Sequence, residues 1–209
     1  MSKEERVIEY YVLCNHLKKL IRSGWKLWNV EKPRLESVAE HIYGVQQLAI
    51  AMASEFHYDI DLKKVIMMLA IHELEEIYIG DIPMSATDYE EKKKAGHAAV
   101  LKVLEPLEMK EYLADLVFEF DRRETKEALF AYHCDKLECD IQAKLYDEEG
   151  YIDLNHQQNN PRYASSFMQN LVSQGVDSFT ELWYTADEPL YKKDENFQKV
   201  FHYARTHYI

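Results

Sequence analysis

The amino-acid sequence predicts an all-α fold, and three observations of composition and spacing carry this prediction. The 209 residues include only 6 Gly and 5 Pro, the residues that most often interrupt helices. Ala, Leu, Lys and Glu recur at helical spacing rather than in the alternation typical of strands. Hydrophobic residues make up 47% of the chain, which is enough for one sizeable core. We therefore expect a single-domain bundle of many helices.

Apolar stripes and end signals place the helices of the first 150 residues. Ser37, with Glu40 three residues later, has the pattern of a capping box, and Asp61 has the position of an N-cap. Glycine at position 80 is a typical helix stop. The first predicted helix spans about residues 3–22, and the second begins at Ser37. The third runs from Asp61 to near Gly80, just before Asp81 and Pro83. Three more are predicted from Thr87-Asp88 to Pro106, at 110–120 and at 125–148. The stretch 24–37 between the first two is expected to be a loop.

The last sixty residues are looser in pattern. The run NHQQNNPRY predicts a polar loop, and shorter helices are expected at about 163–173, 177–184 and 194–206. Their sequence pattern indicates no particular catalytic or binding function. We expect residues 151–209 to form a helical extension packed on the same domain as residues 1–150.

Charge restricts the partners of the protein. The chain carries 37 acidic and 25 basic side chains, for a formal net charge of −12. Such a surface repels a phosphate backbone, so binding to duplex nucleic acid is not expected. A small phosphorylated substrate is still compatible, because a metal ion or one arginine reverses the sign of charge inside a pocket.

Cysteine usage and the N-terminus predict a cytoplasmic protein. Cys14, Cys134 and Cys139 are an odd number of cysteines at spacings that match no zinc knuckle, which favours free thiols in a reducing compartment. The start MSKEERVIEYYVLC is acidic where a signal peptide is basic. No run reaches the roughly 18 apolar residues of a membrane span.

Polar residues interrupt the apolar run VIMMLAI, residues 65–71. On a continuous helix with about 100° per residue, His72, Glu73 and Glu76 fall within one arc and can point into one cavity. Burying an imidazole beside carboxylates costs several kcal/mol unless the groups are compensated. Three compensations are open: contact with water, an ion pair with Arg22 or Lys136, or a divalent cation.

Partners for a cation occur elsewhere in the chain. His41 lies early in its predicted helix, and Asp135 lies in the middle of a long one. Aspartate is a poor helix former, so its presence at this position suggests a functional role. Two histidines, a glutamate and an aspartate would leave open coordination positions for water and substrate, as in catalytic metal sites.

The order of these residues resembles that of the HD-domain metal-dependent phosphohydrolases, in particular the branch of 5'-deoxynucleotidases. The typical string of that branch, H-D-x-x-E-x-x-x-G-D-[IL]-P, is matched by His72, Glu73, Glu76, Gly80, Asp81, Ile82 and Pro83. The segments RSGWKLWNVEKPRLESVAEH and HCDKLECDIQAKLYDE resemble two further family motifs. The resemblance covers about residues 15–150.

The resemblance implies a fold, an activity and a set of roles. The fold would be an HD-domain bundle formed by residues 1–150, and the activity would be removal of phosphate from (deoxy)nucleoside 5'-monophosphates. One divalent ion (Mn, Co, Mg, Zn or Fe) and a homodimer are implied as well. The implied roles are metal ligation by His41, His72, Glu73 and Asp135, catalysis by Glu76 and Asp81, and substrate binding by Arg22 and Trp25.

One departure from the family pattern keeps other functions open. Glu73 stands where the family has the aspartate of its name, and the extra methylene moves the carboxylate by more than the roughly 0.2 Å tolerance of metal–ligand distances unless the chain adjusts. The alternatives are hydrolysis of another phosphorylated small molecule, such as a nucleoside triphosphate or an alarmone, and a degenerate HD domain that binds a nucleotide or a protein partner without turnover.

Overall fold

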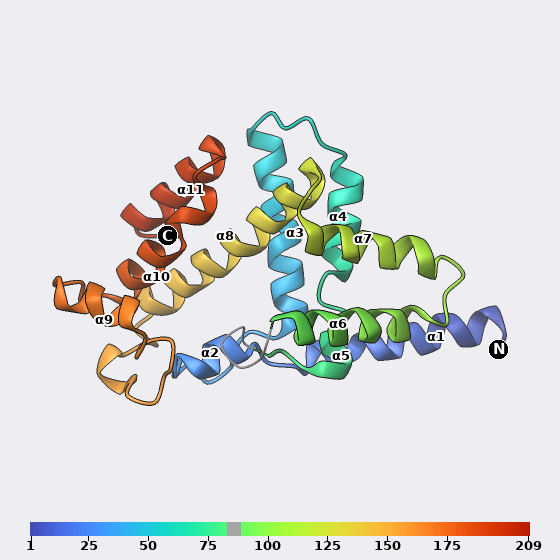
Figure 1. Cartoon of the computed structure of the whole chain (residues 1–209), viewed down its shortest axis with the longest axis horizontal. Helices are drawn as coiled ribbons and strands as arrows, with labels where there is room; N and C mark the ends of the chain where they lie inside the picture. The colour runs from blue at the N-terminus through green and yellow to red at the C-terminus, as the bar shows by residue number, and fades with distance from the viewer. Residues whose placement is uncertain (83–88) are drawn as a thin grey trace. The chain divides into compact units, whose positions relative to one another are not determined.

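The described part of the protein is all-α, as predicted. The computed structural model describes residues 1–82 and 89–209, and within these ranges no β-strand occurs (Figure 1). Among the described residues, only Ile21 and Ser37 have β-type pairing, in an isolated bridge. In the same ranges, no helix combines the length and the apolar character that crossing a bilayer requires.

The chain divides into two compact units, which are described separately. The first contains residues 1–23 and 36–134, and the second contains residues 24–35 and 135–209. The division of the chain after residue 150 that the sequence suggests stays a prediction.

The first unit contains α1 (Lys3–Cys14), the 3-10 helix η1 (Asn15–Lys18), α3 (Val38–Glu55), α4 (Leu62–Ile71), α5 (Glu76–Ile79), α6 (Tyr89–Leu104) and α7 (Lys110–Arg122). The second contains α2 from Gly24 onwards (Ser23–Leu27), η2 (Leu154–His156), α9 (Ser166–Ser173), α10 (Phe179–Asp187), η3 (Glu188–Tyr191) and α11 (Glu195–Thr206). Helix α8 (Lys126–Glu148) is unbroken and contributes to both.

Helices α3 and α4 form the centre of the first unit. They pack along each other (Figure 1) through fully buried apolar side chains at helical spacing, among them Val45 and Ala49 of α3 and Val65 and Leu69 of α4. The predicted caps are confirmed. The Ser37 hydroxyl accepts the Glu40 N–H at 3.3 Å while the Glu40 carboxylate accepts the Ser37 N–H at 2.9 Å, and Asp61 accepts two N–H groups of α4.

The second unit has an aromatic core with a buried carboxyl group. Asp140 accepts hydrogen bonds from the Trp183 indole N–H at 2.8 Å and the Tyr191 hydroxyl at 2.5 Å. Burial, followed by the neighbouring Asp187 carboxylate, raises the pKa of Asp140 well above its usual range. These bonds link α8 to α10 and η3.

The predicted third helix, continuous from Asp61 to Gly80, is wrong. Helix α4 ends at Ile71 and His72 is its C-cap, so His72, Glu73 and Glu76 do not share one helical face. The His72 side chain is the physical reason, because its Nδ1 lies 2.8 Å from the Leu69 carbonyl oxygen and satisfies that group at the helix end. After His72 the backbone changes from α-helical hydrogen bonds to bonds between residues three apart, since the Leu74 N–H donates to the Ile71 carbonyl.

Three other boundaries differ from the prediction or fall outside the described residues. The first helix ends at Cys14 and continues as a 3-10 helix to Lys18 rather than as α-helix to residue 22. A short helix, α2, forms within the stretch expected to be a loop. The predicted helix start at Thr87-Asp88, together with Pro83, lies outside the residues that the structure describes.

Candidate metal centre

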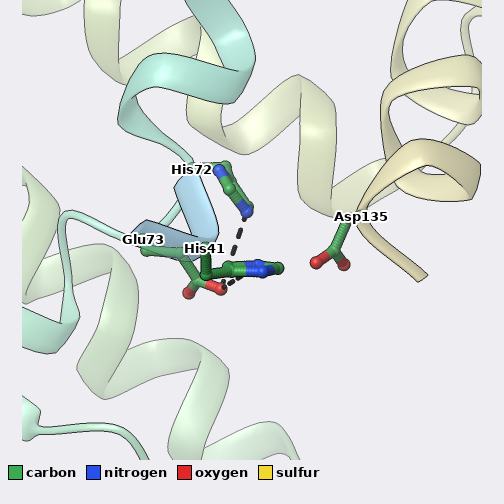
Figure 2. A group of neighbouring side chains, drawn as sticks. All are labelled: His41, His72, Glu73 and Asp135. Carbon is green, nitrogen blue, oxygen red and sulfur yellow. Dashed lines mark ion pairs between the residues drawn. The ribbon is translucent and has the colours of Figure 1, made fainter. Parts of the chain in front are cut away.

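Two histidines and a glutamate of the first unit converge on one point (Figure 2). The Nε2 atoms of His41 and His72 lie 3.7 and 3.6 Å from the same oxygen of Glu73, Oε1. His41 is 0% exposed and His72 is 3% exposed. The open alternative in which the polar residues after residue 71 meet bulk water is therefore wrong for His72.

The turn after α4 orients the His72 ring. Because Nδ1 donates to the Leu69 carbonyl oxygen, the neutral imidazole carries its lone pair on Nε2, the atom that faces Glu73. The Phe120 ring packs edge-on against the imidazole, with the centroids 5.1 Å apart. A backbone carbonyl bonded to the second nitrogen is the usual support of a metal-binding histidine.

Asp135 completes a set of four possible ligands. It lies on α8, directly after Cys134, the last residue of the first unit. One ligand atom from each of His41, His72, Glu73 and Asp135 lies within 4.8 Å of the others. The Asp135 carboxylate also lies 2.9 Å from the Lys136 ammonium.

The donor set fits a divalent ion. Two atoms that each lie about 2.1 Å from one ion are at most about 4.2 Å apart, and the two distances to Glu73 Oε1 are below this limit. Imidazole nitrogens with carboxylate oxygens suit Mn, Fe, Co and Zn. The four residues could therefore hold one metal ion, and the longer side chain of Glu73 reaches both imidazoles.

Arg22 lies beside this cluster and is one of the two ion-pair partners that the sequence suggested. Its Nη1 is 3.4 Å from Glu73 Oε1, and both side chains are mostly buried. The guanidinium thus faces the oxygen that also faces the two imidazoles. The Glu73 carboxylate therefore has an ion-pair partner in Arg22.

The two predicted catalytic carboxylates are also in the first unit. Glu76 is 7% exposed, and its Oε2 has no hydrogen-bond partner among the described residues. Asp81 accepts the Ser23 N–H at 2.5 Å. Burial, followed by the Glu73 and Asp81 carboxylates, raises the pKa of Glu76 to about 11. Carboxylates that raise one another's pKa in this way form a site suited to a cation.

Trp25 is placed in the core of the second unit. It is 2% exposed and stacks on Trp183 with ring centroids 5.7 Å apart, while Tyr146 meets it edge-on. These contacts are those of an aromatic core anchor. Its role in substrate binding stays a prediction.

Glu75 is a functional candidate that the sequence reasoning missed. It precedes Glu76, and burial, followed by the Glu73 carboxylate, raises its pKa to about 8. The signal in the sequence was the close spacing of three glutamates in HELEEI.

Comparison with known proteins agrees with this geometry. A family model described as HD domain matches residues 14–173. A protein named 5'-deoxynucleotidase HDDC2 from Dictyostelium discoideum is 30% identical over 171 residues, which cover 78% of this chain and 86% of the relative. The protein of the same name from Xenopus laevis is 32% identical over 150 residues, covering 70% and 72%.

Solved structures agree as well. A conserved hypothetical protein from Pyrococcus furiosus is 28% identical with a TM-score of 0.71, covering 95% of this chain and 98% of that one. A predicted metal-dependent phosphohydrolase from Magnetospirillum magnetotacticum, at 22% identity and a TM-score of 0.60, covers 96% and 95% and shares the fold. The chain belongs to the HD-domain family of metal-dependent phosphohydrolases.

Proposed function

We propose that this protein removes phosphate from (deoxy)nucleoside 5'-monophosphates in a metal-dependent reaction. The observation that carries the proposal is the convergence of two buried imidazoles and a carboxylate on one point, with Asp135 within ligand distance. The name 5'-deoxynucleotidase, borne by relatives that cover most of the chain, supports the class of substrate. Location in the cytoplasm and assembly as a homodimer stay predictions.

The ligands in this proposal are His41, His72, Glu73 and Asp135, which would hold one divalent ion. When bound, such an ion polarises a phosphate oxygen and lowers the pKa of water, so that hydroxide forms at neutral pH. Mn, Co, Mg, Zn and Fe are the candidate metals, and the imidazole nitrogens favour the transition metals among them over Mg.

The other residues of the site bind, orient and move protons. Glu76, buried beside Glu73, would take a proton from the attacking water as a carboxylate, the form that a neighbouring cation favours. Asp81, fixed by the Ser23 N–H, orients the leaving alkoxide or a sugar hydroxyl. Arg22, whose guanidinium carries a permanent positive charge beside Glu73, neutralises the charge of the phosphoryl group.

A substrate panel tests the proposal. Purified protein is incubated with Mn²⁺, Co²⁺ or Mg²⁺ and with deoxynucleoside and ribonucleoside monophosphates, nucleoside triphosphates and an alarmone, and released phosphate is measured. Release from the monophosphates with a transition metal is the expected result. Preferential turnover of triphosphates or of the alarmone would support the rival hydrolase, and no turnover of any compound would support the degenerate binding domain.

Glu73→Asp tests whether the site is built for its longer carboxylate. Here Oε1 of Glu73 reaches both imidazoles, and an aspartate at the same backbone position would withdraw its oxygen by about one methylene. We expect metal affinity to fall about tenfold or more, because ligand distances tolerate only about 0.2 Å. Titration with Mn²⁺ by calorimetry measures the change, and the exposed Glu105 provides a control as Glu105→Asp.

Equal or tighter binding by the Glu73→Asp protein would contradict this account. It would mean that the turn after α4 moves to compensate for the shorter side chain, and that metal binding does not depend on the length of the Glu73 side chain.

A further inference from the structure

A second polar pocket lies within the first unit, apart from the four candidate ligands. It has a volume of about 140 Å³ and is lined by residues of α5, α6 and α7 and by Glu75 and Arg123, the residues directly before α5 and after α7. Helix α6 packs against both α5 and α7 (Figure 1). About five water molecules occupy such a volume in the liquid. Sites for drug-sized ligands measure about 300–1,000 Å³, so this pocket fits a molecule the size of an amino acid and not a whole nucleotide.

The pocket contains carboxyl groups that suit a hydrogen-bond donor. Glu75 and Asp121 both line it. Asp121 is bonded to His97, whose Nε2 lies 2.6 Å from its Oδ2. Glu75 Oε2 is buried and has no hydrogen-bond partner among the described residues. Since the last torsion of a glutamate is soft, a small rotation brings this oxygen to the pocket, where an ammonium group would satisfy it.

The same pocket contains basic side chains that suit an acid group. Lys92, Lys93 and Arg123 line it. The Lys92 ammonium donates one bond to the Ile82 carbonyl and retains further donors. The Arg123 guanidinium carbon lies 3.9 Å from the centroid of the Tyr132 ring, and a guanidinium on an aromatic face has five N–H donors in its own plane. A carboxylate that enters between these groups would be paired.

The remaining lining is aliphatic. Ile79, Val100 and Val117 contribute apolar surface, and Gly96 forms the wall next to Glu75. No Phe, Tyr or Trp occurs among the described lining residues, whereas a nucleobase is usually held by stacking on such rings. A short aliphatic chain therefore fits this wall better than a base does.

Taken together, the size, the two signs of charge and the aliphatic wall specify one class of ligand. We infer that this pocket binds a small zwitterionic amino acid, with its ammonium group on Glu75, its carboxylate on Lys93 and Arg123, and its side chain against Val100 and Val117. This binding is separate from the proposed hydrolysis and does not require a metal at His72.

Calorimetric titration of the purified full chain with each of the twenty common amino acids tests the inference. L-valine is the reference ligand, isobutylamine lacks only its carboxylate, isovalerate lacks only its ammonium group, and inorganic phosphate is a plain anion. We expect L-valine or another aliphatic amino acid to bind about tenfold or more tightly than either half-ligand. If no amino acid binds, or if isovalerate or phosphate binds equally well, the inference is overturned.

Two variants locate the binding. Glu75→Gln replaces the carboxyl group proposed to hold the ammonium group with an amide, which cannot become a carboxylate. Gly96→Ala adds a methyl group on the wall at an ordinary contact distance of 3.5 Å from Glu75 Cγ. Alanine is the better helix former, so Gly96→Ala retains the fold. Both variants should lose about tenfold or more in affinity, while Lys94→Ala, exposed on the same helix and outside the lining, should not.

A third variant separates this inference from the proposed function. His72→Ala should bind the amino acid as the unaltered protein does, even if it hydrolyses nothing. Undiminished binding by both pocket variants, or binding that disappears in His72→Ala, would place the ligand elsewhere and overturn the inference.

Discussion

His72→Ala is expected to abolish phosphate release from nucleoside monophosphates. The variant removes one of the four candidate ligands, a nitrogen whose tautomer and direction are fixed by the Leu69 carbonyl. A bound ion contributes several kcal/mol of transition-state stabilisation, and every ~1.4 kcal/mol is tenfold in rate. The loss should therefore be roughly 10³-fold or more, measured as kcat with saturating Mn²⁺ or Co²⁺.

His57→Ala is the matched control, because it removes an imidazole from an exposed position of the same unit. This control should retain full activity. Turnover by His72→Ala within a few-fold of the unaltered protein would show that phosphate release does not depend on this cluster.

Glu76→Gln is the second large expected effect. The side chain keeps its size in the buried position, but the amide cannot accept a proton from water. General-base catalysis contributes about 10² to 10⁴-fold, so kcat should fall by that factor. Metal content should be unchanged, because Glu76 is not among the four candidate ligands.

Glu105→Gln, at an exposed position after α6, serves as the control for Glu76→Gln. A Glu76→Gln protein with normal kcat would contradict the role of Glu76. A protein that instead lost its metal would reassign Glu76 as a ligand.

Local signals in the sequence predicted helix starts well. The capping box at Ser37 and the cap at Asp61 depend on residues three positions apart or fewer, so the sequence contains all of the information that they need. The all-α class followed from composition for the same reason. Both predictions are confirmed.

The end of α4 could not be predicted from the same signals. No Gly or Pro interrupts the run before Gly80, and propensity alone favours a continuous helix. The helix ends because the His72 ring turns back to the Leu69 carbonyl and packs on Phe120, a residue 48 positions later. Contacts between distant segments thus override the local preference.

The candidate site was reached by two routes. Periodicity suggested a shared face for His72 and Glu73, and that argument fails because the residues lie on a turn. The resemblance to the family, which depends on the order of the motifs along the chain, predicted that His72 and Glu73 lie close to His41 and Asp135. Helical spacing could not predict this, because His41 and Asp135 belong to other helices. The pocket beside Glu75 was not predicted at all, because its lining comes from three separate helices whose packing the local sequence pattern does not specify.

Metal content tests the central claim most directly. Elemental analysis of the protein, loaded with Mn²⁺ or Co²⁺ and freed of excess ion, should give about one equivalent per chain, and the His72→Ala protein should retain a small fraction of that. The His57→Ala control should match the unaltered protein. A chain that binds no ion, or a His72→Ala protein that retains a full equivalent, would contradict the claim that His41, His72, Glu73 and Asp135 form a metal centre.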